Sequence, residues 1–382
     1  MPSHAGNPFP NMKFNITSGE LVKALSAVAG VVPSKATLPI LENVLFESVD
    51  GALKLTATDN EIYIVEQVAA EIVKDGSVAI PARRLLDTMR QLPDIPLSFD
   101  IDDRCTVKFR TDRGAYKLVG AKAEDFPMLP SVNEGTTIMV DTESLTSGIE
   151  KTRFAVSTDD LRPNMMGVYF QVDEEKTRLV ATDGHRLVRL VKYDMKGDVP
   201  VNFIVPDKAL AQVTRTLNGG ETKMQITKHH VRFTNGEAEV IARLINESYP
   251  NYENVIPKEN EKIMTVTKND MLATVRRVSI FSSSTTRQIR LNLSQDEVSI
   301  FAEDYEMSSE ARESIKCQYE AEDMVIGFNA RYLADVLNNI TNEEVTFAFS
   351  TPNRAGIVQP LEQAADEDLL MLIMPVMLNT QG

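Results

Sequence analysis

The chain has 382 residues, 43% of them hydrophobic and 25% charged, which is the composition of a globular protein. Its longest apolar run, residues 369–378, contains Pro375 and falls short of the roughly 18 apolar residues that a membrane helix needs, so a transmembrane protein is excluded. The formal net charge of −15 argues on average against a nucleic-acid binder, although the positions of the basic residues matter more than their sum.

The N-terminal residues and the cysteines exclude further classes. Residues 1–11 carry three prolines and no apolar core, so we expect a disordered extension or a cloning remnant there rather than a secretory signal. Cys105 and Cys317 are far apart, and the four histidines are too scattered for a metal centre. We therefore expect a cytoplasmic protein with no disulfide, no metal and no cofactor.

The chain contains three copies of one pattern. In the first copy, a capping box formed by Thr17 and Glu20 opens a helix, a strand-like run L-T-A-T-D-N-E contains Asp59, and a strand stopped by proline leads into a second helix. Asp183 in L-V-A-T-D-G-H-R-L and Asp304 in I-F-A-E-D-Y-E occupy the same place in the second and third copies. The spacing of apolar residues predicts two helices in each copy, over residues 18–30, 82–91, 142–153, 207–217, 269–280 and 330–340.

Each copy has the order helix, strands, helix, strands. This order predicts an α+β fold made of three tandem copies of one domain, each with two helices and largely antiparallel sheets. Polar stretches at 132–135 and 256–262 separate the copies. We therefore predict domains over residues 12–133, 134–257 and 258–382, each the size of an ordinary domain rather than of a solenoid repeat.

Asp183 and His185, on either side of Gly184, are the pair of residues in the chain that most resembles part of a catalytic or metal-binding site. Two interpretations are open at this point: half of a hydrolytic or metal site, or a tight hairpin turn with a polar tip. The first and third copies place N-E and Y-E after the shared aspartate, and the chain has no serine or cysteine nucleophile motif. The aspartate is therefore predicted to be a structural recurrence, and no catalytic residue is expected.

The predicted helices hold more Lys and Arg than Asp and Glu, while the rest of the chain is strongly acidic. One interpretation is that these basic residues lie on ordinary solvated helix faces. The other is that equivalent helices of a repeated unit point the same way and together present a positive surface to a polyanion. The sequence alone leaves both interpretations open.

Six short motifs occur in a fixed order along residues 12–378. They are Thr37-Leu38-Pro39-Ile40-Leu41, the central A-T-D-G-H-R-L, Val205-Pro206, Tyr249-Pro250-Asn251-Tyr252 with Ile256-Pro257, Ile326-Gly327-Phe328-Asn329, and Met374-Pro375-Val376-Met377-Leu378. Together they resemble the bacterial DNA polymerase III β subunit family, the sliding clamps. The resemblance implies a homodimer that closes head to tail into a ring of six similar domains, with helices lining the hole, and it implies no catalysis.

The resemblance also implies a function and partners. The ring encircles double-stranded DNA without sequence specificity, is placed there by a clamp loader, and tethers DNA polymerases and repair proteins that carry short linear motifs. No membrane partner is implied. Two functions of other classes are weighed against this one: an Asp/His-dependent hydrolase, and a tandem scaffold that never meets DNA. The scaffold would leave the positive helices unexplained.

The resemblance assigns residues to three surfaces. A groove for peptides with leucine and an aromatic residue matches Met165, Thr182, Gly184, His185, Arg186, Leu187, Pro250, Val255, Met374, Pro375, Val376, Met377 and Leu378. The positions facing DNA match Lys35, Arg83, Arg84, Arg162, Lys208 and Arg215. The dimer interface matches Arg113, Tyr116 and Leu118 on one edge strand and Ile280 and Phe281 on the other side. Ring closure would pair edges that would otherwise be exposed.

Three departures from the family pattern bear on these assignments. Met377 replaces a residue that is often basic, and residues 379–382 extend beyond the usual end, so either could alter peptide preference. Asp159 stands where the family carries a neutral polar residue, in the loop that contains Arg162. For this loop, a capped surface turn is the alternative to a DNA contact. The methionine-rich C-terminal run independently favours a binding surface that adapts to different ligands.

Overall fold

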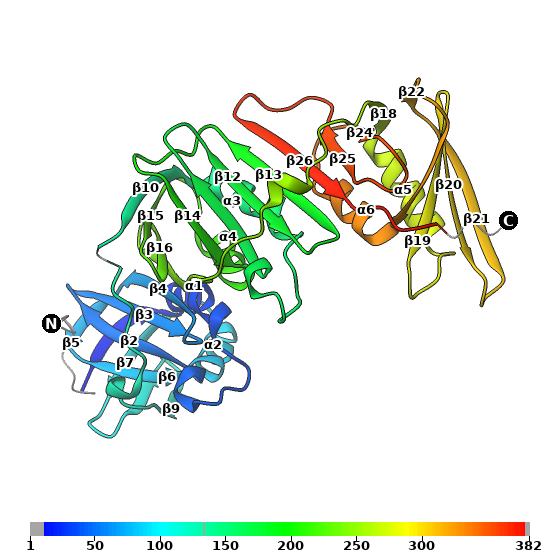
Figure 1. Ribbon diagram of the computed structural model, residues 1–382. Helices are drawn as coiled ribbons and strands as arrows, with labels where there is room; N and C mark the ends of the chain where they lie inside the picture. Colours follow the sequence, from blue (N-terminus) through cyan, green and yellow to red (C-terminus); the bar gives the residue numbers. More distant parts are fainter. Residues whose placement is uncertain (1–10, 133, 379–382) are drawn as a thin grey trace. The chain divides into compact units, whose positions relative to one another are not determined.

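The structure is a computed structural model that describes residues 11–132 and 134–378 (Figure 1). Most of the predicted N-terminal extension and the C-terminal extension at 379–382 lie outside the described residues. Six α-helices occur in the described part, and their ends differ from the predicted ones by at most two residues. They are α1 (Ser18–Val28), α2 (Ala82–Arg90), α3 (Thr142–Arg153), α4 (Asp207–Thr216), α5 (Lys268–Ser279) and α6 (Ala330–Asn338). None of these helices is long and apolar enough to cross a membrane.

The first compact unit comprises residues up to Glu143 together with Lys208–Leu244. Its five-stranded sheet has the order β5 (Glu71–Lys74), β1 (Lys13–Thr17), β7 (Pro96–Ile101), β8 (Thr106–Arg110), β9 (Ala115–Val119). Its eight-stranded sheet has the order β10 (Thr136–Asp141), β15 (Glu221–Ile226), β16 (His230–Asn235), β17 (Ala238–Arg243), β4 (Ile62–Ala69), β3 (Ala52–Thr58), β2 (Asn43–Val49), β6 (Ser77–Pro81). Helix α1 packs against α2 and against β3 and β4.

The core of the first unit contains a row of stacked aromatic rings that crosses the five-stranded sheet. Phe14 stacks on Phe99 with ring centroids 4.6 Å apart, Phe99 on Phe109 at 5.1 Å, and Phe109 on Tyr116 at 4.6 Å. The three phenylalanines are buried, but Tyr116 lies on the edge strand β9 and is 36% exposed. The row therefore connects the hydrophobic core to an edge of the sheet, where an aromatic face remains accessible.

The second compact unit comprises Ser144–Asp207 and the chain from Ile245 onward. Its nine-stranded sheet has the order β14 (Val201–Pro206), β11 (Gly167–Val172), β12 (Thr177–Thr182), β13 (Arg186–Lys192), β26 (Glu367–Ile373), β25 (Gly356–Pro360), β24 (Glu344–Phe349), β18 (Lys262–Thr267), β22 (Gln318–Tyr319). Its four-stranded sheet has the order β21 (Ser309–Lys316), β20 (Glu297–Asp304), β19 (Gln288–Ser294), β23 (Met324–Asn329). Helix α5 packs against α6 and against β20 and β21. The paired strands of the described residues are antiparallel, which confirms the predicted α+β class.

The middle copy of the pattern contributes strands to both units. Its strand β17 pairs with β4 of the first copy, and its strand β13 pairs with β26 of the third copy. Each pairing extends one sheet across two copies by backbone hydrogen bonds. Because the contacts group the chain into two units rather than three, the three domain boundaries of the sequence analysis stay a prediction.

The aspartate that recurs in the three copies closes a hairpin turn in each. Asp59 accepts hydrogen bonds from the backbone N–H groups of Glu61 and Ile62 (3.0 and 2.8 Å), Asp183 from those of His185 and Arg186 (2.9 and 3.0 Å), and Asp304 from those of Glu306 and Met307 (3.0 and 3.2 Å). A carboxylate that satisfies the backbone of its own turn favours the turn over any extended alternative. The predicted structural recurrence is confirmed, and the interpretation of the Asp-Gly-His sequence as a polar hairpin tip is the correct one.

Candidate functional site

The turn between β12 and β13, residues 182–187, requires a glycine and is held from both sides. The hydroxyl of Thr182 donates to the carbonyl of Arg186 at 2.7 Å and accepts from the N–H of Gly184 at 3.1 Å. Gly184 has a φ of +88°, and a Cβ there would lie 2.9 Å from the Arg162 guanidinium. That guanidinium donates to the carbonyl of Asp183 at 3.1 Å. A side chain at residue 184 would strain the backbone and displace Arg162.

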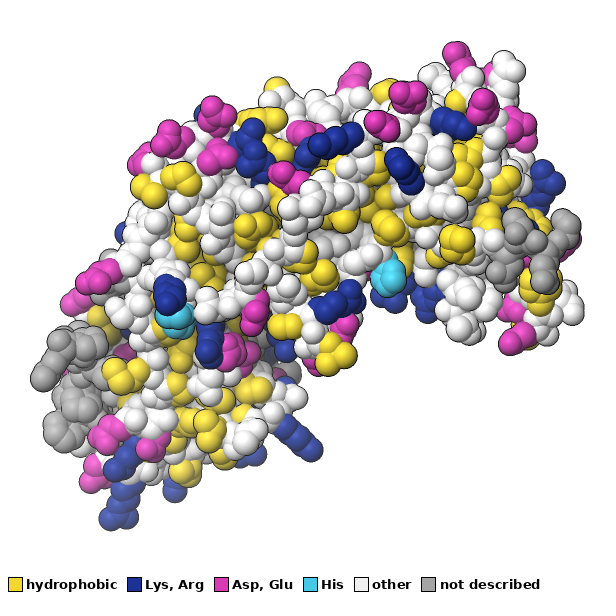
Figure 2. All heavy atoms as spheres, in the orientation of Figure 1, with side chains coloured by type: hydrophobic (Ala, Val, Ile, Leu, Met, Phe, Trp, Pro, Cys, Tyr) yellow, Lys and Arg dark blue, Asp and Glu magenta, His cyan; other side chains and the backbone are white. Residues whose placement is uncertain are grey.

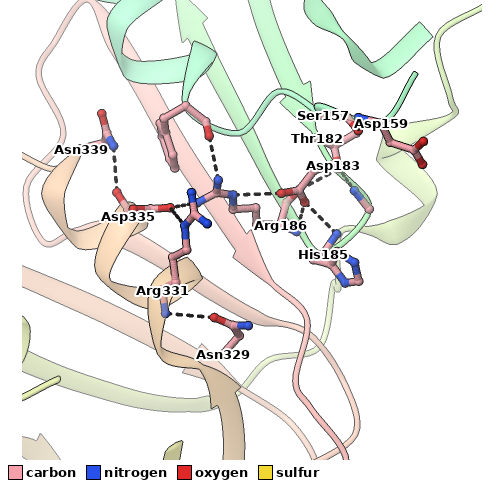
Figure 3. A network of polar contacts seen from close by, with 12 residues as sticks. Ser157, Asp159, Thr182, Asp183, His185, Arg186, Asn329, Arg331, Asp335 and Asn339 are labelled. Atoms are coloured by element: carbon pink, nitrogen blue, oxygen red, sulfur yellow. Dashed lines mark hydrogen bonds and ion pairs between the residues drawn. The ribbon is translucent and has the colours of Figure 1, made fainter. Parts of the chain in front are cut away.

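Arg186 is buried, with only 7% of its surface exposed, and it sits between two carboxylates (Figure 3). Its guanidinium donates to Asp183 at 3.2 Å, to Asp335 of α6 at 2.6 Å and to the backbone carbonyl of Phe154 at 2.8 Å. It also lies over the rings of Phe154 and Tyr332, at 5.3 and 4.9 Å from their centroids. A buried cation is stable only when its donors are satisfied in this way.

The exposed side chain of His185 extends the contact with α6. Its imidazole stacks on the ring of Tyr332 with centroids 5.5 Å apart. Its backbone carbonyl accepts a hydrogen bond from the N–H of Met374 at 2.8 Å, so the turn binds the segment that follows β26. The imidazole therefore acts as a packing group on a surface that two copies of the pattern build together.

The segment Met374 to Leu378, which we call the tail, runs from this turn to β23. The N–H of Val376 donates to the carbonyl of Gly327 at 2.9 Å. A Cβ at Gly327 would lie 2.6 Å from a methyl carbon of Leu378 and 2.9 Å from the Val376 carbonyl, so the close approach of the tail depends on this glycine. Met374 and Met377 are 41% and 74% exposed. The tail thus presents flexible apolar side chains while its backbone is fixed.

Met165 and Pro250 lie near the turn on loops that are bonded to each other. The side-chain amide of Asn164 donates to the carbonyl of Ser248 at 3.0 Å, and the sulfur of Met165 is 3.9 Å from the Arg162 guanidinium. Val255 ends the short 3₁₀ segment Tyr252–Val255 and is 52% exposed. These residues add further apolar surface to the second unit.

The aromatic residues beside Pro250 fix its segment over β11 and β12. Tyr249 stacks on Tyr169 with ring centroids 4.6 Å apart, and its hydroxyl donates to the carbonyl of Val180 at 3.3 Å. Burial raises the pKa of the Tyr249 hydroxyl, so it remains a neutral donor. The loop is therefore part of the packed structure rather than a free segment.

Three of the predicted groove residues are buried. Leu187 is 2% exposed and packs in a cluster with Val180, Tyr252, Ala355 and Leu372. Arg186 is buried by the contacts described above, and Thr182 is also buried. Because a buried side chain contacts a bound peptide little, these three residues would support a groove from beneath rather than line it. The groove itself stays a prediction.

No pattern in the sequence pointed to the two residues of α6 that contact the turn. Tyr332 and Asp335 lie one helical turn apart, and both contact the 182–187 turn. They belong to the third copy, whereas the turn belongs to the middle one. Only the pairing of β13 with β26 brings them together, and the spacing of apolar residues within one copy does not encode it.

Four of the six predicted DNA-facing residues lie in the first unit with exposed side chains, which form no hydrogen bond or ion pair among the described residues. Arg83 and Arg84 lie on α2 beside a surface cavity of about 980 Å³, and Lys35 and Lys208 are exposed on a loop and at the start of α4. Arg215 donates to the carbonyl of Ser26 at 3.1 Å. On the face seen in Figure 2 both signs of charge are interspersed.

Arg162, in the second unit, differs from the other predicted DNA-facing residues. Its guanidinium pairs with Asp159 at 2.9 Å. The backbone N–H of Leu161 and then the Arg162 side chain hold the pKa of Asp159 below its usual range, so the carboxylate stays ionised beside the arginine. The loop is thus a capped turn whose cation is already neutralised.

The predicted dimer residues lie at an edge strand in the first unit and directly after helix α5 in the second unit. Tyr116 and Leu118 are on β9, the last strand of the five-stranded sheet, and Arg113 precedes that strand. Ile280 and Phe281 follow α5 and are 78% and 40% exposed. Strand β21 is the corresponding edge of the four-stranded sheet next to α5. Tyr116, Ile280 and Phe281 thus leave apolar surface exposed beside these strands.

Comparison with known proteins gives consistent matches along the chain. The family described as DNA polymerase III beta subunit matches by its N-terminal domain over residues 12–130, its central domain over 139–251 and its C-terminal domain over 253–377. The beta sliding clamp of Caulobacter vibrioides is 35% identical over 373 residues, which cover 94% of this chain and 100% of that protein.

Solved structures show the same similarity. A DnaN sliding clamp from Pseudomonas aeruginosa bound to griselimycin is 32% identical with a TM-score of 0.90, covering 96% of this chain and 100% of that one. The DNA polymerase sliding clamp from Bacillus subtilis is 25% identical with a TM-score of 0.91 and the same coverage.

Proposed function

The chain belongs to the DNA polymerase III beta subunit family, the beta sliding clamps. We propose that two identical chains close head to tail into a ring around duplex DNA. We propose further that each chain tethers partner proteins at the surface beside the 182–187 turn. The chain is a non-catalytic processivity factor rather than an enzyme. The observation that carries the proposal is the succession of three family domains along residues 12–377. The hydrolase alternative has lost its basis, because Asp183 caps its own turn.

The proposed contact with DNA is weak and independent of sequence. A ring is held on DNA by topology, so its basic residues need only screened contacts with phosphates, and tight binding would oppose sliding. Exposed Lys35, Arg83, Arg84 and Lys208 suit such contacts. Since bacterial chromosomal DNA is in the cytoplasm, we infer that the protein acts there. A scaffold that never meets DNA would have no use for these cations.

The topological proposal can be tested by loading the protein with its clamp-loading ATPase onto nicked circular DNA and then cutting the circle once. We expect the protein to stay with the circular DNA during gel filtration and to leave after linearisation, because a ring slides off free ends. Blocking both ends with bound protein should restore retention. Equal retention on circular and unblocked linear DNA would refute encirclement.

In the proposed ring, strand β9 of one chain pairs with strand β21 of the other chain. Both are edge strands, and an unpaired edge is a hazard that closure would remove. Basic residues outnumber acidic ones over 106–122, and acidic residues outnumber basic ones over 297–316. This complementarity favours contact between unlike edges, hence a head-to-tail arrangement, over contact between like edges.

The proposed docking surface takes a short peptide with leucine and an aromatic residue. The exposed side chains of Met374, Met377 and Val255 offer apolar surface, and thioether side chains adapt to different apolar partners. The backbone beneath is fixed by hydrogen bonds from Met374 to His185 and from Val376 to Gly327. We propose that the clamp loader, polymerases and repair proteins share this surface in turn.

Asp159→Asn should strengthen binding to duplex DNA by about two- to threefold at low salt, because it removes the carboxylate that neutralises Arg162. Asparagine retains an acceptor for the Leu161 N–H, so the turn should persist. If Arg162 then contacts one more phosphate, the plot of log affinity against log salt should steepen by about 0.9.

The measurement is fluorescence anisotropy of a labelled duplex over a series of salt concentrations. The matched control is Asp160→Asn, which removes the same charge from the adjacent residue. If both variants change the salt dependence equally, the effect is one of net charge, and Arg162 is not a latent phosphate contact.

A further inference from the structure

The middle and third copies meet along one pair of strands in the second unit. Strands β13 and β26 pair over their full lengths, and we call this pairing the joint. Cations of the middle copy face carboxylates of the third copy along it: Lys151 with Glu367, Arg186 with Asp335 at 2.6 Å, Arg189 with Asp368 at 3.0 Å, and Lys192 with Asp366 at 2.9 Å. In each of these pairs the middle copy supplies the cation and the third copy supplies the carboxylate. Their attraction therefore stabilises the pairing of the middle copy with the third copy.

The best-buried cation of the joint stays charged. Lys192 is 3% exposed, and burial alone would disfavour its ammonium. The hydrogen bond to Asp366 and the charges of Asp194 and Glu367 outweigh this cost and raise the pKa of Lys192. The same hydrogen bond lowers the pKa of Asp366. The ion pairs of the joint therefore persist at neutral pH.

Arg186 differs from the other cations of the joint because it also belongs to the 182–187 turn. Its guanidinium bonds Asp183 inside the turn and Asp335 on α6 at the same time (Figure 3). Asp335 also faces Arg331 at 4.0 Å, so its carboxylate lies between two arginines. The buried side chain of Arg186 thus couples the position of the turn to the position of α6.

The same helix contacts the exposed part of the turn. Tyr332 stacks on His185 and lies under the Arg186 guanidinium. The carbonyl of His185 in turn binds the N–H of Met374, the first residue of the tail. A shift of the turn away from α6 would therefore move both the imidazole and the start of the tail.

We propose that Asp335 is a positioning residue for peptide docking: through Arg186 it holds the 182–187 turn and the tail in the arrangement that a peptide binds. This inference rests on the proposed docking function. Asp335 itself need not touch the peptide, because its carboxylate is directed toward Arg186. Without it, Arg186 keeps Asp183 and the Phe154 carbonyl, so the turn remains formed. The turn's remaining contacts with α6 would then be the weaker ring contacts of Tyr332 with His185 and Arg186. The apparent affinity for the peptide then equals the intrinsic affinity multiplied by the fraction of molecules in the competent arrangement.

The test compares three full-length variants: Asp335→Asn, Asp335→Glu and Asp368→Asn. Asp368→Asn removes the partner of Arg189 in the same joint but lies outside the turn and the tail, so it is the matched control. Asparagine is isosteric with aspartate, and Asp335→Glu keeps the charge while altering the 2.6 Å geometry. Affinity for a fluorescent peptide with leucine and phenylalanine is measured by anisotropy. Hydrogen exchange of residues 182–187 and 374–378 and the unfolding temperature are measured in parallel.

We expect Asp335→Asn to weaken peptide binding by about tenfold and to speed exchange in the turn and the tail, with Asp335→Glu intermediate. Asp368→Asn should lower the unfolding temperature yet keep the peptide affinity within about twofold. Equal losses of affinity in Asp335→Asn and Asp368→Asn, or unchanged affinity in Asp335→Asn, would overturn the positioning role of Asp335 but leave the proposed docking function standing. A wild-type chain that binds no peptide would instead overturn the proposed docking function on which the inference rests.

Discussion

Replacing Ile280 and Phe281 together by aspartate is expected to convert the proposed dimer into monomers. The two side chains are 78% and 40% exposed in the single chain, next to the end of α5 and the edge strand β21. Burying an apolar side chain of this size contributes roughly 1.5–3 kcal/mol, and aspartate would place a charge where that burial occurs. A closed ring has two identical interfaces, so the loss counts twice and should weaken the dimer on the order of 1,000-fold or more.

Sedimentation over a range of concentrations measures this change directly. Val73→Asp is a matched control, because Val73 is 60% exposed on β5, at the other edge of the five-stranded sheet from β9. This variant should remain dimeric. The monomeric variant should also fail to stay on circular DNA after loading, because one chain would not close around the duplex. A double variant that sediments as the wild-type dimer would place the interface elsewhere.

Local features of the fold were predictable because they depend on residues close in sequence. The six helices follow from apolar spacing and from caps such as the Thr17–Glu20 box, which the structure contains. The recurrence of Asp59, Asp183 and Asp304 predicted a repeated turn, and each carboxylate binds the backbone two and three residues ahead. These interactions close within a few residues, so no tertiary context can change them much.

The candidate site was only partly predictable because it joins two copies of the pattern. Resemblance to the family pointed to the 182–187 turn and the tail, and it assigned Arg186 and Leu187 to the lining of a groove, whereas both side chains are buried. Leu187 is buried because β13 pairs with β26 and presents it to a core cluster that includes Leu372. Arg186 is buried because Asp335, far along the chain, compensates its charge. Without these partners, the side chain of a lone arginine or leucine in a turn would be predicted to be exposed to solvent.

The mixed outcome for the basic residues has the same physical cause, a partner that lies elsewhere in the chain. Arg83 and Arg84 are exposed, as a DNA contact requires. Arg162 is similar to them in sequence terms, yet its guanidinium is engaged by Asp159 and by the carbonyl of Asp183. Whether a cation is available depends on neighbours three residues and 21 residues away, and only the first of these is visible as a pattern in the sequence.

Ending the chain after Ile373 is expected to abolish peptide docking while the dimer remains. This truncation removes the exposed Met374 and Met377 and the hydrogen bonds by which the tail reaches His185 and Gly327. Loss of two apolar side chains and of the fixed backbone between them should weaken peptide binding by about 100-fold or more, corresponding to at least about 2.7 kcal/mol. Strands β9 and β21 are untouched, so ring closure should persist.

A chain that ends at Leu378 is the control that separates the tail from the four residues beyond it. It keeps every described contact of the tail, including the approach of Leu378 to Gly327, and should bind the peptide within about threefold of the full chain. Anisotropy of the labelled peptide and sedimentation of each truncated chain give the two readouts. If the chain ending at Ile373 still binds with wild-type affinity, the exposed methionines are not the docking surface. If both truncations lose affinity equally, recognition lies beyond Leu378, and the 182–187 turn with its fixed tail would be a structural junction only.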